Sequence, residues 1–138
     1  MRQLTKKERD CVVVLGKSTG GSFPNRLIDL SETMEIRPPT ALNLVKRLET
    51  KKVLEHRKGM IILTKNGVNI FHEIEENHRI LETLMVKYGM DVDKACLLSE
   101  TIDFQIDHIA VDKMFEKLGK PEKCPHGREI TQFHEENK

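Results

Sequence analysis

The chain has 138 residues, of which 33% are charged and 38% hydrophobic, with a net charge of +1 and three cysteines. This length allows one or two small domains. The near-neutral charge excludes a global positive field, so any DNA-binding surface must be local. An odd number of cysteines, with no apolar run of membrane length and no signal-peptide pattern, predicts a reduced cytoplasmic protein that makes no membrane contact.

The first half of the chain predicts helix, helix, turn, basic helix and hairpin. The first helix, 5–17, begins with a capping box formed by Thr5 and Glu8 and carries an apolar stretch. A short helix at 25–31 is expected to turn Leu27, Ile28 and Leu30 inward. The remaining elements are a proline turn at 34–40, a helix at 41–51 with apolar positions 41, 44, 45 and 48, and strands at 53–57 and 60–64 around Lys58-Gly59. This order predicts a winged helix-turn-helix over residues 1–65.

The second half predicts an all-helical domain over residues 66–138, so the protein as a whole is mainly α. A long amphipathic helix runs from about 68 to 86 and stops at Gly89. Residues 91–98, a helix or turn, lead directly into a helix at 99–118 with an apolar stripe at Ile102, Ile106, Ile109 or Ala110, Met114 and Leu118. We expect 119–138 to be irregular and partly disordered.

Two sets of polar side chains at helical spacing predict a metal site. His78 and Glu82 are four residues apart, and Cys96, Glu100, Asp103 and Asp107 follow at spacings of four, three and four. Each set projects from one helix face, and the mixture of imidazole, thiol and carboxylate suits a transition metal. Asp107 is interpreted as a solvated carboxylate and Cys11 as a core residue.

Cys124 and His126 leave two interpretations open. They could supply a thiolate and an imidazole, but they lack the second pair of a structural zinc site, so a structural loop is favoured.

The predicted DNA-reading surface consists of basic and polar residues on and beside the helix at 41–51. Base edges would be read by residues at or within the first turn of that helix, namely Arg37, Pro39 and Asn43, because Asn suits an adenine edge and Arg a guanine edge. Phosphates would be held by Lys46, Arg47, Lys58 and Lys65.

Three segments then resemble the iron- and manganese-dependent transcriptional repressors typified by the diphtheria toxin repressor and the manganese transport regulator. These segments are Glu-Asn-His-Arg-Ile-Leu-Glu (76–82), Ser-Glu-Thr-Ile-Asp (99–103) and Lys-Cys-Pro-His-Gly-Arg-Glu-Ile (123–130). Residues 34–49 match the family's recognition helix, with Pro39-Thr40 at its start, and 65–67 match the end of its wing. The chain looks like the short, two-domain type. The resemblance implies a homodimer that binds a palindromic DNA operator when Fe(II) or Mn(II) is bound.

The resemblance also implies metal ligands, position by position. His78 and Glu82 match the family's His-x-x-x-Glu, Glu100 and Asp103 match its next two acids, Cys96 takes the place of an ancillary His, and Asp10 falls at its N-terminal carboxylate. Phe104 and Lys7 stand where the family has further ligands. We therefore expect one well-formed site, which would tie Asp10 to the second domain and fix the spacing of the two DNA-reading heads.

Two other functions are alternatives to a metal-activated repressor. One is a winged-helix regulator that responds to an organic effector, with the polar face merely solvated. The other is a small metal-dependent hydrolase, which is disfavoured because no nucleophile, phosphate loop or paired general base is evident. The sequence thus predicts a protein that is not an enzyme.

Overall fold

The computed structural model describes residues 3–18 and 25–130. The chain divides into two compact units, Met1–Phe71 and His72–Lys138, which are described separately. The boundary predicted from sequence, between 65 and 66, lies at the start of the helix that passes from one unit into the other. Within the described ranges, no helix is both long enough and apolar enough to cross a membrane.

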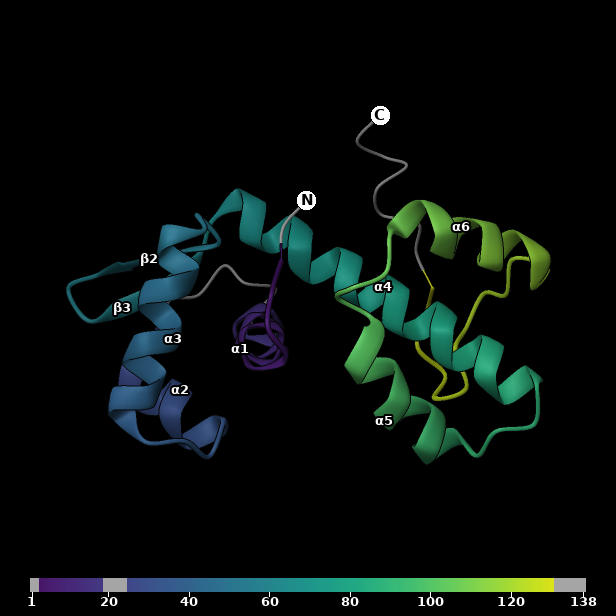
Figure 1. Ribbon diagram of the computed structural model, residues 1–138, viewed down its shortest axis with the longest axis horizontal. Coiled ribbons are helices and arrows are strands. Elements are labelled where there is room, and N and C mark those ends of the chain that lie inside the picture. Colours follow the sequence, from purple (N-terminus) through teal and green to yellow (C-terminus); the bar gives the residue numbers. More distant parts are fainter. Residues whose placement is uncertain (1–2, 19–24, 131–138) are drawn as a thin grey trace. The chain divides into compact units, whose positions relative to one another are not determined.

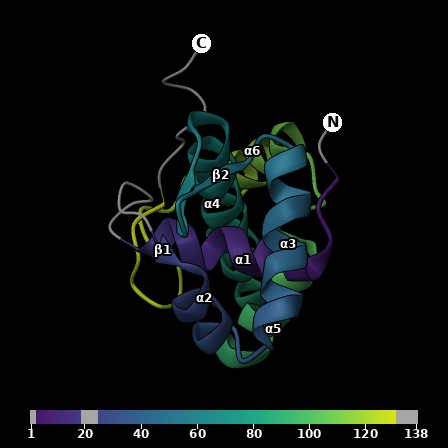
Figure 2. The same ribbon diagram turned by 90° about the vertical axis from the view of Figure 1, so that its left-hand side faces the viewer.

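The N-terminal unit is a helical cluster with a small antiparallel sheet (Figures 1 and 2). Its sheet has the strand order β1-β3-β2. The elements are α1 (Lys6–Lys17), β1 (Asn25–Arg26), α2 (Leu27–Thr33), α3 (Pro38–Thr50), β2 (Leu54–Arg57), β3 (Met60–Leu63) and the start of α4 (Lys65–Lys87). The predicted fold class, a mainly helical protein with an N-terminal winged helix-turn-helix, is confirmed.

Helix α1 forms because its first turn is capped and its apolar face is buried. The Thr5 hydroxyl accepts from the Glu8 N–H, and the Glu8 carboxylate accepts from the Thr5 N–H, which completes the predicted capping box. Cys11 and Val12 are fully buried, so burial outweighs the low helix propensity of the β-branched residues in this stretch. Burial also raises the pKa of the Cys11 thiol to about 12, and the acidic side chains of Glu8 and Asp10 add to the effect.

The second predicted helix begins later than expected. Asn25 and Arg26 pair with Ile61 and Met60 as strand β1, so α2 starts at Leu27. Ile28, expected to face inward, is 50% exposed. Leu30 is buried as predicted, together with Ser31.

The wing is a two-residue hairpin. Lys58 and Gly59 both have positive φ, 52° and 76°, as the preferred tight hairpin turns require. Residues 65–67, matched to the end of the wing, form the first turn of α4. The Thr64 hydroxyl accepts from the Gly67 N–H at 3.1 Å, as an N-cap does.

The C-terminal unit packs α5 (Val92–Ile102) and α6 (His108–Lys117) on different sides of α4 (Figure 1). Gly89, with φ of 94°, ends α4 as predicted. The single helix predicted over 99–118 is wrong, because the chain turns at 103–106 and restarts at the N-cap Asp107, whose carboxylate accepts from the Ile109 N–H.

This break changes which side chains of α6 are buried. Ile109 and Ala110, the two alternatives for one position of the predicted apolar stripe, are both exposed, Ile109 by 58%. Val111 and Phe115 pack with Ile80 of α4, and three members of the predicted stripe, Ile106, Met114 and Leu118, pack partly buried against this cluster.

A loop after α6 is held on the same unit. Lys123 and Glu129 form an isolated antiparallel bridge, the Arg79 guanidinium of α4 donates to the Glu129 carbonyl at 2.8 Å, and the Ile130 N–H donates to Glu122. The loop is therefore ordered by hydrogen bonds, without a regular element beyond the bridge in 119–130. The remainder of the predicted irregular tail, with His134, lies outside the described residues.

Gly67 has a packing role that can be tested. A Cβ there would collide with the carbonyl oxygen of Val53, a backbone atom that also accepts from the Thr64 N–H. We expect Gly67→Ala to lower the free energy of unfolding by about 1–3 kcal/mol, as overpacked sites do. Urea denaturation would measure the change. The neighbouring exposed substitution Asn66→Ala serves as the control and should change stability by less than about 0.5 kcal/mol.

Candidate metal centre and nucleic-acid interface

His78, Glu82 and Cys96 come together in the C-terminal unit, as the sequence predicted. Helix α4 places His78 and Glu82 on one face, and α5 brings Cys96 to the same point. The His78 Nε2 atom lies 3.4 Å from Glu82 Oε2 and 3.4 Å from Cys96 Sγ. One donor atom from each of the three residues lies within 4.8 Å of the others. These three residues form the first donor group.

A second donor group shares Glu82 and uses the loop after α6. The other carboxylate oxygen, Oε1, lies 3.2 Å from His126 Nδ1, and Cys124 completes a group whose donor atoms also lie within 4.8 Å of one another. The spacing of Cys124 and His126 favours a structural loop, with metal ligation as the alternative. Their Cys-x-His spacing was the available signal, but only the folded loop shows that both reach Glu82.

The shared carboxylate is buried and incompletely satisfied. Glu82 is 2% exposed, and its Oε2 atom has no hydrogen-bond partner among the described residues. A buried carboxylate without such partners is costly unless a cation compensates it. The orphaned oxygen, two imidazoles and two thiols thus form a set of the type that binds transition metals.

Both thiols have a higher pKa than a free cysteine, so they lose their protons less readily. Burial raises the pKa of Cys96, and the negative charges of Glu82 and Glu100 raise it further. Burial likewise raises the pKa of Cys124, with a further contribution from its hydrogen bond to Glu82. Because a thiol binds a metal as the thiolate, metal binding at this site would release protons. The affinity for the metal would therefore decrease as the pH falls.

The remaining predicted ligands are not part of either donor group. Asp103 is fully buried and faces the other nitrogen of His78, with its Oδ2 atom 3.0 Å from Nδ1. Glu100, one turn before it, stands outside both donor groups. Phe104, at a position where the resemblance places a further ligand, lies in the turn after α5.

Asp10 lies in the N-terminal unit. Its carboxylate pairs with Lys6 at 2.7 Å and with Arg9 at 3.0 Å on α1. Lys7, the other departure from the resemblance on this helix, is exposed.

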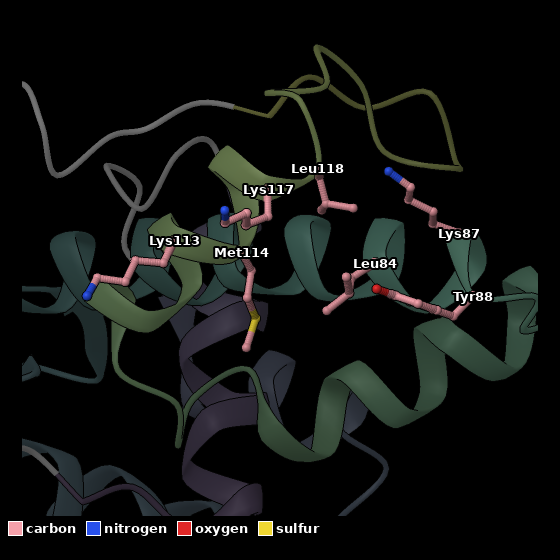
Figure 3. Close-up of a pocket in the computed structure, with 7 residues that line it drawn as sticks. All are labelled: Leu84, Lys87, Tyr88, Lys113, Met114, Lys117 and Leu118. Carbon is pink, nitrogen blue, oxygen red and sulfur yellow. The ribbon is translucent and has the colours of Figure 1, made fainter.

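A separate groove in the C-terminal unit is chemically unsuited to a cation. It has a volume of about 260 Å³ and lies between the ends of α4 and α6 (Figure 3). Its lining residues are Leu84, Lys87, Tyr88, Lys113, Met114, Lys117 and Leu118. None of them is a histidine, cysteine or carboxylate, and three ammonium groups would repel a metal ion.

The predicted DNA-reading residues are all exposed in the N-terminal unit. Helix α3 buries Ala41, Leu44, Val45 and Leu48 and turns its other side outward. The exposed set consists of Arg37, Pro39, Thr40, Asn43, Lys46 and Arg47 around α3, Lys58 at the hairpin turn and Lys65 at the start of α4. Pro38 and Pro39 start the helix where proline costs least.

A buried carboxylate joins α1 to α3. Glu8 is fully buried and lies 2.8 Å from the Lys51 ammonium and 3.8 Å from the Arg47 guanidinium. Burial acts to raise the pKa of Glu8, but hydrogen bonds from Lys51 and the Thr5 N–H, with the positive charges of Lys51 and Arg47, leave the pKa below its usual value. This contact holds the C-terminal half of α3 against the first helix.

Comparison with known proteins points to one family. Residues 64–132 match the family model described as iron dependent repressor, metal binding and dimerisation domain. An uncharacterised HTH-type transcriptional regulator from Aeropyrum pernix is 25% identical over 120 residues, which cover 86% of this chain and 66% of that protein.

Solved structures share the fold. A hypothetical protein from Sulfolobus solfataricus matches with a TM-score of 0.80 and 27% identity, covering 93% of this chain and 99% of that one. The manganese regulator SloR matches at 0.77 and 22%, covering 94% and 61%. ScaR with bound Zn²⁺ matches at 0.74 and 22%, covering 89% and 58%. The chain thus spans about three-fifths of the length of the last two.

The Glu8 contact predicts a specific dependence of stability on pH. Because the folded pKa is below the usual 4.5, the contribution of Glu8 is fully present above pH 4.5 and is lost as the pH falls through the folded pKa. The Glu8→Gln variant should therefore lose less stability than wild type below pH 4.5, starting from a lower value at pH 7. Thermal melts between pH 3 and 7 would measure this. Glu32→Gln, at an exposed position of α2, should behave as wild type.

Proposed function

Because the chain belongs to the family of iron-dependent repressors, as its sequence motifs predicted, we propose that it is a metal-activated transcriptional repressor. The observation that carries this proposal is the convergence of two donor groups on the buried, incompletely satisfied carboxylate of Glu82. The winged helix-turn-helix in the other unit supplies a surface for the DNA operator.

The proposed ligands are Glu82, His78 and Cys96 from the helices, and Cys124 and His126 from the loop. Two thiolates and one carboxylate would carry three negative charges. A divalent cation would offset most of this buried charge, which would otherwise be uncompensated. Thiolate and imidazole donors favour Fe(II) or Zn(II) over Mn(II), which prefers oxygen. We therefore propose one ion per chain and place Fe(II) and Zn(II) ahead of the Mn(II) that the family resemblance also allowed.

The bound cation would act through geometry and not through chemistry. It would neutralise the Glu82 charge and join α4, α5 and the loop, three segments that otherwise meet around an uncompensated carboxylate. Asp10 remains a proposed additional ligand from the N-terminal unit, as the family resemblance implies. Such a tie would select one arrangement of the DNA-reading units from those available to the metal-free protein.

The proposed operator contacts divide into two kinds. Asn43 and Arg37 lie at the start of α3 or in its first turns, where a recognition helix reads base edges. Lys46, Arg47, Lys58 and Lys65 would hold phosphates. Arg47 also lies near Glu8, so its phosphate contact would compete with an existing interaction.

The protein is proposed to act as a homodimer on a palindromic operator. The matched family domain is a dimerisation domain. The C-terminal unit exposes apolar side chains of a kind that dimers cover, with Leu97 65% and Leu98 40% exposed on α5 and Tyr88 83% exposed after α4. We propose no enzymatic activity, because the polar groups of the site are metal donors and the relatives with a described role are regulators.

The metal proposal predicts a selective effect of Glu82→Gln. Loss of the shared carboxylate should weaken Zn(II) and anaerobic Fe(II) binding by more than the roughly 100-fold seen when outer-shell partners are removed. The melting temperature of the metal-free protein should not fall, because a buried charge is removed. Competition with a chromogenic chelator would give the affinities. The control Glu100→Gln, outside both donor groups, should weaken binding less.

Two further outcomes would decide the proposal. Wild-type affinity in Glu82→Gln would remove the site as proposed. An operator affinity that ignores metal ions and chelators would favour the organic-effector regulator instead.

The DNA proposal predicts that Asn43→Ala and Lys46→Ala act differently. The operator would first be selected from randomised duplexes in the presence of the metal. Asn43→Ala should then cost about 1–3 kcal/mol on that operator and relax the preference at one base pair. Lys46→Ala should weaken operator and random DNA alike and lower the salt slope by about one. Fluorescence anisotropy at several salt concentrations would separate them, and an unchanged salt slope for Lys46→Ala would contradict the placement of α3 on DNA.

A further inference from the structure

The two nitrogens of His78 face different partners. Nε2 lies 3.4 Å from Cys96 Sγ and 3.4 Å from Glu82 Oε2, the side of the first donor group. Nδ1 lies 3.0 Å from Asp103 Oδ2. A carboxylate facing Nδ1 favours the imidazole form that has a proton on Nδ1 and a free lone pair on Nε2.

Asp103 is held in this place by its own backbone. Its N–H donates to the Ser99 carbonyl at 2.8 Å, and its carbonyl accepts from Asn77 Nδ2 at 3.0 Å. Asn77 also donates to the Ile106 carbonyl at 3.4 Å, so one buried amide from α4 fixes the whole turn that follows α5. The side chain of Asp103 is itself fully buried. The carboxylate is therefore presented to His78 from a rigid support.

We propose that Asp103 is a positioning residue for the metal centre, holding the His78 ring so that Nε2 points at the ion, and that it is not itself a ligand. This inference rests on the proposed function. The arrangement is the carboxylate–histidine–metal series, in which the outer carboxylate sets the ring orientation and increases the basicity of the coordinating nitrogen. The next residue, Phe104, cannot coordinate a metal.

Asp103 therefore has a different role in this chain from the ligand role that the family resemblance implies. The resemblance implies that Glu100 and Asp103 are metal ligands and that the family has a further ligand at position 104. In the structure the Asp103 carboxylate is directed at His78, and Glu100 stands outside both donor groups. The same buried turn therefore supports the Glu82 centre instead of building a second one.

The first test reads the His78 ring without any metal. In protein labelled with ¹⁵N-histidine, NMR of the neutral ring should show wild-type His78 with its proton on Nδ1. Asp103→Ala should shift His78 toward the Nε2-protonated form that free imidazoles prefer, while the exposed substitution Glu116→Gln should leave the signal unchanged. An Nε2-protonated His78 in the wild type would overturn the proposal. This readout stands even if the protein binds no metal, so it fails separately from the proposed function.

The second test asks whether Asp103 acts through His78. Asp103→Asn should weaken Zn(II) binding by about 10–100-fold, the usual effect of losing an outer carboxylate. In a His78→Ala background the same substitution should change Zn(II) affinity by less than about threefold, because a positioning residue has nothing left to position. An equal loss in both backgrounds would show that Asp103 binds the ion directly. Unchanged affinity in the single variant would show that its role is only structural, and either result overturns the proposal.

Discussion

The Glu82 carboxylate is the constraint around which the C-terminal unit is organised. One oxygen faces His78 and Cys96, and the other faces His126 beside Cys124. Burial of this charge is unfavourable in the absence of compensation. The free energy of the unit therefore depends on what stands next to Glu82, and a divalent cation is the partner that its surrounding donors suit. In the proposed function, this one side chain links the binding of a metal to the order of three segments.

The supports of this carboxylate come from all parts of the unit. Helix α4 supplies Glu82 itself, and Ile80 on the opposite side packs against Val111 and Phe115 of α6. The Arg79 guanidinium donates to the Glu129 carbonyl and so holds the loop that carries His126. Three neighbouring side chains of α4 thus have different roles: Ile80 packs the core, Arg79 holds the loop and Glu82 presents a carboxylate to the donor groups.

The N-terminal unit contains another buried carboxylate, that of Glu8, whose neighbours differ from those of Glu82. Glu8 is paired with Lys51 and Arg47 of α3 and takes part in the capping box of α1. Two cationic side chains of the protein offset its charge, although its Oε2 atom, like that of Glu82, has no hydrogen-bond partner among the described residues. The two buried carboxylates thus differ in their neighbours, because Glu8 faces the cations of Lys51 and Arg47, whereas Glu82 faces imidazole and thiol groups.

The sequence alone determined the elements whose signals are local. The capping box at Thr5, the prolines at the start of α3, the Lys58-Gly59 turn and the period of α4 each predicted an element that the structure contains. The spacing of His78 and Glu82 on one helix face followed from the same 3.6-residue period. These features depend on neighbours within a few residues, which is why they can be read without a fold.

Only the tertiary structure decided which donors meet. Helical periodicity joined residues 96–107 into one ladder, but Asn77 of α4 holds a turn at 103–106 that ends α5 and sends Asp103 to the far side of His78. Cys124 and His126 reach Glu82 across more than forty residues of chain. No local pattern specifies such a contact, because it arises from the packing of α4, α5, α6 and the loop and not from the sequence around any one of them.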